Sequence, residues 1–327
     1  MRRRDFIGAI YSAALSLPFA AAGQQPGKVW RIGDVLPFTP ERGGHFVLTL
    51  EQRLADLGYV EGRNIALFHR LAGPQPDKLQ EAIVSLVQQV DLLVVWGPIA
   101  GIAAKKLAGD VPTVFISISF PVEIGLVQSL AHPGGNMTGI AAEAASETYG
   151  KRLQILKEIV PDLKRVAVLS PIGDPNVGFD IKSLGLAAHE LGVTLLPVDI
   201  TSADELATAF ASFKHSGAEA LIVIRSALAS AVAKQIADLA LAAHLPSCYA
   251  QRDLVTAGGL VSLDSSLPDM IRPAAVQIDK IIKGLSPADI PIEQPTRLEL
   301  SINLNTARLL NLTIPPSLLA RADELIE

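Results

Sequence analysis

Apolar residues in the first half of the chain fall into short continuous runs, separated by longer amphipathic stretches. The runs predict strands at 29–36, 64–70, 91–97 and 112–118, and the amphipathic stretches predict helices at 45–57, 77–89 and 99–107. Runs such as DLLVV and TVFISI are continuous rather than alternating. That pattern is typical of parallel strands that helices cover on both faces.

The same pattern begins again after HPGGNMTG (132–139), which is predicted to be a loop. Strands are predicted at 165–170, 193–200, 220–226, 245–250 and 259–264, and helices at 148–159, 177–191, 202–213 and 227–244. The repetition predicts an α/β protein with two successive doubly wound, Rossmann-like modules. A helix at 266–283, an extended segment at 295–304 and short helices to Glu327 follow, and this tail is predicted to cross back between the modules.

The composition is that of a globular protein. The chain has 327 residues, 49% of them hydrophobic and 19% charged, which is enough for two domains. A formal net charge of -5 argues against a nucleic-acid partner, because phosphate binding needs a basic surface. The single cysteine, Cys248, excludes an internal disulfide and is predicted to be a buried, inert thiol. A monomer is expected.

The first residues, MRRRDFIGAIYSAALSLPFAAAG, have the three parts of a secretory signal. Three arginines precede an uncharged apolar run, and small residues near Ala22 offer a cleavage site. We predict a signal peptide over residues 1–23 and export to the periplasm. The alternative is an N-terminal membrane anchor, but the run is shorter than the roughly 20 residues of a bilayer span. The arginine pair fits the twin-arginine route and the general route alike.

Motifs for catalysis or cofactor binding are absent from the sequence. It contains no GxGxxG, no GxxxxGK[ST] and no GxSxG. The six histidines show no HxH or HxxxH spacing, so no metal site is predicted. We therefore expect a protein without a cofactor or enzymatic activity, although an active site assembled from scattered residues stays an alternative.

The residues that follow the predicted strands suggest a ligand site instead, because ligands of doubly wound sheets bind beyond the carboxyl ends of the strands. These positions carry aromatic rings, hydroxyls, a helix start and a few charges, which suits a cleft for a small molecule. The candidate ligand-binding residues are Phe38, Trp96, Gly97, Pro98, Ser117, Ser119, Pro121, Asn176, Arg225, Tyr249, Gln251 and Asp264.

Several of these residues have a purely structural alternative. Trp96 ends a buried strand and suits core packing as well as ligand contact. Asp174 and Asn176 suit the cap of the helix near Val177, and Pro121 suits a turn. Arg225 follows the apolar run ALIVI and needs either a partner or water.

The chain resembles bacterial ABC transporter substrate-binding proteins of the tryptophan/tyrosine type, which have a type I periplasmic binding protein fold. The resemblance covers nearly the whole chain. It is carried by RIGDVLP (31–37), LADLGYVEGRNI (54–65), FPVEIGLVQSLAHPGGNMTGI (120–140), GKRLQILKEIVPDLKRVAVL (150–169), AGGLVSL (257–263) and the long segment from KIIKGLSPADIPIEQPTRLELSINLN (280–305) to Glu327. Departures from the family pattern fall at cleft positions, including RIGDVLP in place of RIGYLS, so ligand identity is not inherited.

The resemblance implies two lobes joined by three crossing segments, near 140–146, 262–266 and 290–297. The N-terminal lobe is expected to hold 28–141 plus 265–291, and the C-terminal lobe 142–264 plus 292–327. It implies a periplasmic protein that binds an amino acid or a related small molecule between the lobes and delivers it to an ABC permease in the inner membrane. An exported sensory subunit that docks on a membrane receptor stays open as an alternative. A transcriptional regulator would need a DNA-binding helix-turn-helix in place of the export signal.

Overall fold

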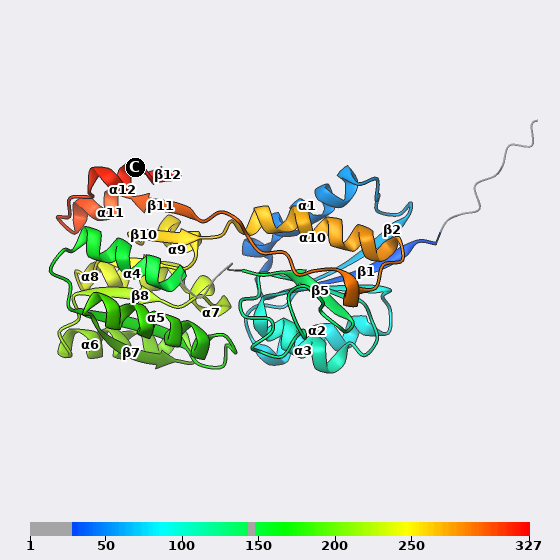
Figure 1. Cartoon of the computed structure of the whole chain (residues 1–327), viewed down its shortest axis with the longest axis horizontal. Coiled ribbons are helices and arrows are strands. Elements are labelled where there is room, and N and C mark those ends of the chain that lie inside the picture. The colour runs from blue at the N-terminus through cyan, green and yellow to red at the C-terminus, as the bar shows by residue number, and fades with distance from the viewer. Residues whose placement is uncertain (1–27, 143–147) are drawn as a thin grey trace, which may run out of the picture.

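The computed structural model describes residues 28–142 and 148–327. Residues 1–23, predicted as the signal peptide, lie outside the described residues, as does 143–147 within the first predicted crossing segment. The described part forms two lobes that lie side by side along the longest axis (Figure 1).

The first lobe is built on a five-stranded parallel sheet in the order β2-β1-β3-β4-β5. Its strands are β1 (Trp30–Leu36), β2 (Ile65–Leu71), β3 (Leu92–Trp96), β4 (Thr113–Ile116) and β5 (Met137–Ile140). Every residue of β3 is buried, because the strand is central and has helices on both faces. The continuous run LLVVW is the sequence signature of that position.

Four helices cover this sheet: α1 (Pro40–Asp56), α2 (Pro76–Val87), α3 (Gly97–Leu107) and α10 (Leu267–Ile282). Helices α1 and α10 pack on one face, where Leu92 and Val94 point, and α2 and α3 pack on the other, where Leu93 and Val95 point. Helix α10 comes from a part of the chain that follows the second sheet. Figure 1 shows it beside α1.

Strand β5 corrects the prediction of a loop at 132–139. It is a short edge strand with the sequence MTGI, too brief to show a hydrophobic period. A Cβ at Gly139 would lie 2.1 Å from the backbone oxygen of Phe115, so the close approach of β4 and β5 requires glycine at this position.

The second lobe is built on a seven-stranded sheet in the order β12-β11-β10-β9-β8-β6-β7. Its strands are β6 (Arg165–Pro171), β7 (Thr194–Ile200), β8 (Ala220–Val223), β9 (Ser247–Tyr249), β10 (Val261–Asp264), β11 (Glu299–Asn303) and β12 (Glu324–Ile326). Only the β10–β11 pair is antiparallel among the pairs described. The C-terminal tail thus adds two strands to this sheet.

The helices of the second lobe are α4 (Thr148–Ile159), α5 (Val177–Leu191), α6 (Leu206–His215), α7 (Ala227–Ala231), α8 (Ala233–Ala242), α9 (Arg252–Thr256), α11 (Leu304–Leu309) and α12 (Pro316–Leu319). Two short 3-10 helices, η1 (Ala203–Glu205) and η2 (Pro287–Asp289), complete the described elements. The helix predicted at 227–244 is divided at Val232, whose backbone is not helical.

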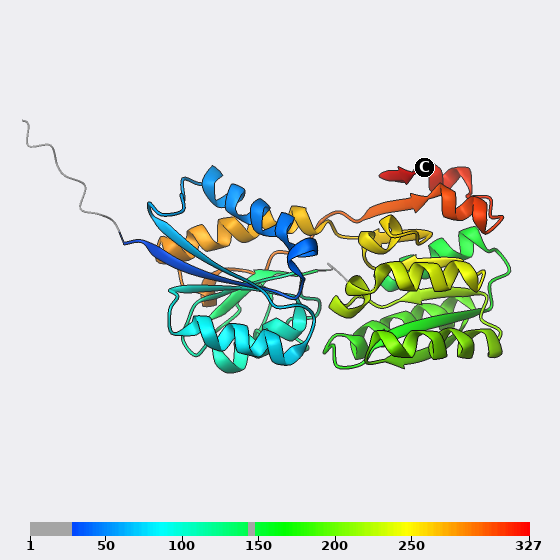
Figure 2. The same ribbon diagram turned by 180° about the vertical axis from the view of Figure 1, so that it is seen from behind.

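The chain passes between the sheets after β5, between β10 and α10, and between η2 and β11. Figures 1 and 2 show the last two passages as neighbouring segments on one side of the gap between the lobes. They contact the first passage: the amide of Ala141 donates to the carbonyl of Glu293 at 2.8 Å, and the hydroxyl of Ser265 donates to the carbonyl of Ala142. Most strands of the two sheets end toward the same gap, whereas β11 is antiparallel to β10 and runs away from it.

Candidate ligand-binding site

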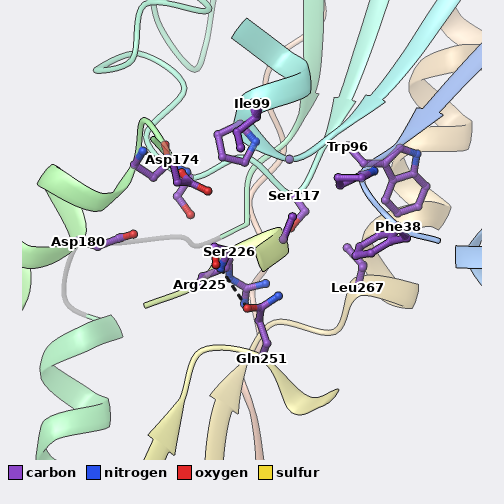
Figure 3. Close-up of a pocket in the computed structure, with 16 residues that line it drawn as sticks. Phe38, Trp96, Ile99, Ser117, Asp174, Asp180, Arg225, Ser226, Gln251 and Leu267 are labelled. Atoms are coloured by element: carbon purple, nitrogen blue, oxygen red, sulfur yellow. Dashed lines mark hydrogen bonds between the residues drawn. The ribbon is translucent and has the colours of Figure 1, made fainter. Parts of the chain in front are cut away.

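A cavity lies between the two lobes at the carboxyl ends of their strands (Figure 3). About 660 Å³ of space in and around it is free of protein atoms, and part of this space is open to solvent. Its walls are formed by Pro37, Phe38, Trp96, Gly97, Pro98, Ile99, Ser117, Ser119, Asp174, Asn176, Asp180, Arg225, Ser226, Ala227, Gln251 and Leu267. Both lobes therefore contribute to one site.

Aromatic side chains of the first lobe form one wall of the cavity. The rings of Phe38 and Phe46 are 5.3 Å apart between centroids, and those of Phe46 and Trp96 are 5.7 Å apart. Phe38 follows β1 and Trp96 ends β3, and both line the cavity. Phe46, on α1, contacts both rings. Such a cluster offers an apolar or planar part of a ligand a large contact area.

A buried carboxylate fixes the orientation of Trp96. The indole Nε1 donates to Oδ1 of Asp34 at 2.7 Å, and Asp34 is fully buried in β1. The other carboxylate oxygen lies 2.9 Å from Nδ1 of His69, whose Nε2 is 3.1 Å from Oε1 of Glu51. Burial lowers the pKa of His69, but the hydrogen bonds and charges of Asp34 and Glu51 outweigh burial, so the pKa is raised. Trp96 thus serves both core packing and the cavity wall.

The segment after β4 places two serines at the cavity. Ser117 has a φ of 61°, and Phe120, three residues later, has a φ of 50°. Both are in the left-handed region, which residues other than glycine seldom adopt and which often occurs at functional sites. The amide of Ser117 donates to the carbonyl of Ile140 at 3.0 Å, and this bond anchors the segment to β5.

The segment between β6 and α5, together with the first turn of α5, supplies acidic and amide side chains to the opposite wall. Asp174 is 9% exposed, Asn176 5% and Asp180 2%. Burial raises the pKa of Asp174 to about 6, although the backbone amide of Asn176 and the charge of Arg225 act in the opposite direction. That amide donates to Oδ1 of Asp174 at 3.0 Å. The side chain of Asn176 makes no capping bond to α5, so its alternative role as a helix cap is not observed.

Arg225 forms a buried ion pair at the edge of the cavity. Its Nη2 donates to Oδ1 of Asp264, and its backbone amide donates to the hydroxyl of Tyr149 at 3.0 Å. Asp264 also accepts from the amide of Arg252 at 3.1 Å. Burial raises the pKa of Asp264, and the charges of Arg225 and Arg152 oppose the rise.

Hydrogen bonds within the second lobe hold Gln251 and Ser226 in place. The amide of Ser226 donates to Oε1 of Gln251 at 3.1 Å, and Nε2 of Gln251 donates to Oγ of Ser230 at 2.7 Å. Oγ of Ser226 accepts from the amide of Ala229 at 2.9 Å and so caps α7. These two side chains form the floor of the cavity below Ser117 in Figure 3.

A second cavity adjoins the first and shares Phe38, Arg225, Gln251 and Leu267 with it. A bridge between the lobes lies on its wall. Arg42 of α1 donates to the carbonyl of Ser230 and to Oδ2 of Asp253, both in the second lobe. The lobes are therefore in direct contact around the candidate site.

Residues 46–326 match the model of one protein family, described as ABC transporter substrate binding protein. The chain belongs to this family. A curated relative, the tyrosine-binding protein of Clostridioides difficile, is 24% identical over 266 residues, which is 79% of this chain and 74% of that protein.

Two solved structures share the fold of this family member. One is a conserved domain protein from Vibrio cholerae, and the other is an ABC domain from Streptococcus pneumonia in complex with L-Trp. Each superposes with a TM-score of 0.85 at 22% identity, over 91% of this chain and all of the other. The prediction of two parallel-sheet lobes with a type I periplasmic binding protein fold is thus confirmed.

The structure places most of the predicted contact residues of this substrate-binding protein at one cavity. Those that line it are Phe38, Trp96, Gly97, Pro98, Ser117, Ser119, Asn176, Arg225 and Gln251. Their role in binding stays a prediction. The shared feature that brings them together is their position just beyond the carboxyl end of a strand.

Three predicted residues do not line this cavity. Tyr249 is fully buried in the core of the second lobe, against Gly259. Pro121 is buried in a turn, where its carbonyl accepts from the amide of Leu126 at 2.9 Å, as its structural alternative proposed. Asp264 pairs with Arg225 and lines the second cavity.

The residues predicted from the sequence do not include several that line the cavity, among them Asp174, Asp180, Ser226 and Leu267. Asp174 follows a strand, but its position shortly before the predicted helix at 177–191 favoured the role of a helix cap. Asp180 lies in the first turn of α5, and Leu267 begins α10, which follows the second sheet in the chain. No sequence pattern around Asp180 or Leu267 indicates that they line a cleft.

Residues 28–142 and 148–327 contain no group of three or more histidine, cysteine or acidic side chains placed to hold a metal ion. In the same ranges, no helix combines the length and the hydropathy needed to span a membrane. Cys248 is buried, as predicted, and burial raises the pKa of its thiol to about 12.

Proposed function

We propose that this protein is the periplasmic solute-binding component of an ABC importer. It binds one small molecule in the cavity between the lobes and presents the closed form to a permease in the inner membrane. The observation that carries the proposal is a single cavity to which both lobes contribute side chains, in a chain of the substrate-binding protein family. The export signal predicted at residues 1–23 supports the periplasmic location.

The three passages of the chain between the lobes form the hinge in this proposal. A ligand that touches both walls makes its full set of contacts only when the lobes are closed, so it shifts the population toward the closed form. Binding requires no acid, base or nucleophile, and the protein performs no chemistry on the ligand.

The ligand class follows from the walls and from the relatives. Phe38 and Trp96 suit an aromatic or apolar body, and the acidic wall suits a polar group. The relative from Clostridioides difficile is named for tyrosine, and the structure from Streptococcus pneumonia holds L-Trp. We propose an amino acid or a related metabolite with a planar or apolar side chain.

A thermal-shift screen of the mature protein with amino acids, aromatic amines, aromatic acids and short peptides tests the proposal. A ligand of the native state raises Tm by mass action. We expect Phe38→Ala to weaken the binding of a hit about tenfold, because the contact area lost is that of a partly buried aromatic ring. Leu48→Ala, an exposed position on α1, is the control and should bind like the parent. If no compound in the screen raises Tm, the proposed function is wrong.

A further inference from the structure

The two walls of the cavity differ in character, and all the acidic groups of its lining lie on one of them. Figure 3 shows Phe38 and Trp96 on one side and Asp174 and Asp180 on the other. Both carboxyl groups are more than nine-tenths buried and belong to one segment, at the start of α5. A buried carboxylate interacts strongly with any opposite charge that enters the same water-poor space.

The arginines in the walls already have carboxylate partners. Among the described residues that line the two adjoining cavities, Arg225 pairs with Asp264 and Arg42 pairs with Asp253. Arg252 pairs with Glu324, with 2.6 Å between its Nε and Oε2 of Glu324. A ligand carboxylate would have to compete with these partners. A ligand cation at Asp174 meets the charge of Arg225, which its pairing with Asp264 already offsets.

Asn176 adds an independent observation on the same wall. Its side chain is 5% exposed, and its Oδ1 has no hydrogen-bond partner among the described residues. A buried acceptor without a partner costs free energy, and a ligand that donates a hydrogen bond removes that cost. The neighbouring Asp174 accepts one bond from the Asn176 amide, and a carboxylate has the capacity to accept more.

We propose that Asp174 and Asn176 select a ligand with a protonated amine, and that a ligand carboxylate is dispensable. The inference rests on the proposed function, since it names the ligand class of the same cavity. The amine donates to Asp174 and Asn176 while the apolar body contacts Phe38 and Trp96. Aromatic amines and zwitterionic amino acids are both accepted, and aromatic acids without an amine are rejected because their negative charge faces buried carboxylates.

Two matched series of compounds test this inference. Tryptamine, L-tryptophan and indole-3-propionate share a ring and differ in charged groups, as do tyramine, L-tyrosine and 3-(4-hydroxyphenyl)propionate. Their affinities for the full mature protein are measured by titration calorimetry. We expect the amine of the better series to bind at least as tightly as its amino acid, and the acid to bind at least a hundredfold more weakly.

Asp174→Asn keeps an oxygen that accepts from the Asn176 amide and removes the charge. We expect the variant to bind the amine roughly thirtyfold more weakly, the order of a charge-assisted hydrogen bond. Asp204→Asn, an exposed position in η1, is the matched control. Binding of the acid as tightly as the amine, or a change below threefold in Asp174→Asn, overturns this inference alone. Failure of every compound in the wider screen overturns the proposed function instead.

Discussion

Asp174 shows how a single residue of the site acts against the stability of the fold. Its carboxyl group is buried and accepts one backbone hydrogen bond, and burial raises its pKa from the ordinary value of 3.8 to about 6. The folded state therefore binds this proton more tightly than the unfolded chain does. A buried group of this kind is typical of a site that is completed by a ligand.

We predict that Asp174→Asn stabilises the ligand-free protein at neutral pH. Because the folded pKa is raised, the parent loses stability as pH rises from about 4 through about 6. Each pKa unit corresponds to about 1.36 kcal/mol, so the loss is on the order of 3 kcal/mol. The variant avoids it, and its Tm should exceed that of the parent by several degrees at pH 8 and match it near pH 4.

Thermal unfolding of both proteins across this pH range, without ligand, measures the difference. Asp204→Asn should track the parent at every pH, since that side chain is exposed. A variant that is less stable than the parent at pH 8 would show that Asp174 supports the fold rather than the ligand.

At the residue scale, the sequence indicates where ligand contacts gather but not which partners the side chains take. Trp96 and Arg225 were predicted correctly as cavity residues because ligands bind beyond the carboxyl ends of parallel strands, and both residues lie at such ends. The pairing of Arg225 with Asp264 joins residues 39 positions apart, and the bond from Trp96 to Asp34 spans 62 positions. Such contacts depend on strand order, which local patterns do not specify.

At the scale of elements, continuous apolar runs predicted the central strands, because burial on both faces leaves a clear signal in the sequence. Strands β5 and β12 were missed, since each has only three or four residues at or near a sheet edge. The early start of α1 was also missed. It begins at Pro40 rather than near 45, in a turn with two glycines that lowers helix propensity.

Helix α1 carries a contact whose loss should weaken ligand binding. Arg42 bonds to Ser230 and Asp253 of the other lobe, so this contact exists only when the lobes are close. We predict that Arg42→Ala lowers affinity about twofold to fivefold, because a pair that is one-third exposed contributes at most about 1 kcal/mol. The effect should shrink in high salt.

Arg53→Ala is the matched control for this prediction. Arg53 lies on the same helix with the same exposed fraction, but its partner is Asp56 of α1 itself. Calorimetric titration of both variants with ligand, at low and at high salt, compares the effects of the two substitutions on affinity. Equal effects of the two substitutions would mean that the contact between the lobes does not contribute to closure.

At the scale of the molecule, the contacts between the lobes surround the cavity instead of filling it. The rings of Phe120 and Phe179 meet across the gap with 5.4 Å between centroids, and Arg42 bridges it beside the second cavity. The space between these contacts is lined by side chains of both lobes. A ligand placed there adds contacts to both lobes. Without a ligand, only a few direct bonds hold the lobes together, and the conformational freedom gained on opening acts against them.

We therefore predict that the ligand-free protein samples a more open form in solution and that ligand compacts it. Small-angle X-ray scattering should give a larger radius of gyration without ligand than with a saturating aromatic amine. Saturation should also bring the scattering curve close to that calculated for the present arrangement of the lobes. The matching aromatic acid at the same concentration is the control, because it should leave the curve unchanged. Identical curves with and without a bound ligand would mean that the lobes are fixed, and binding would then need another route into the cavity than opening of the lobes.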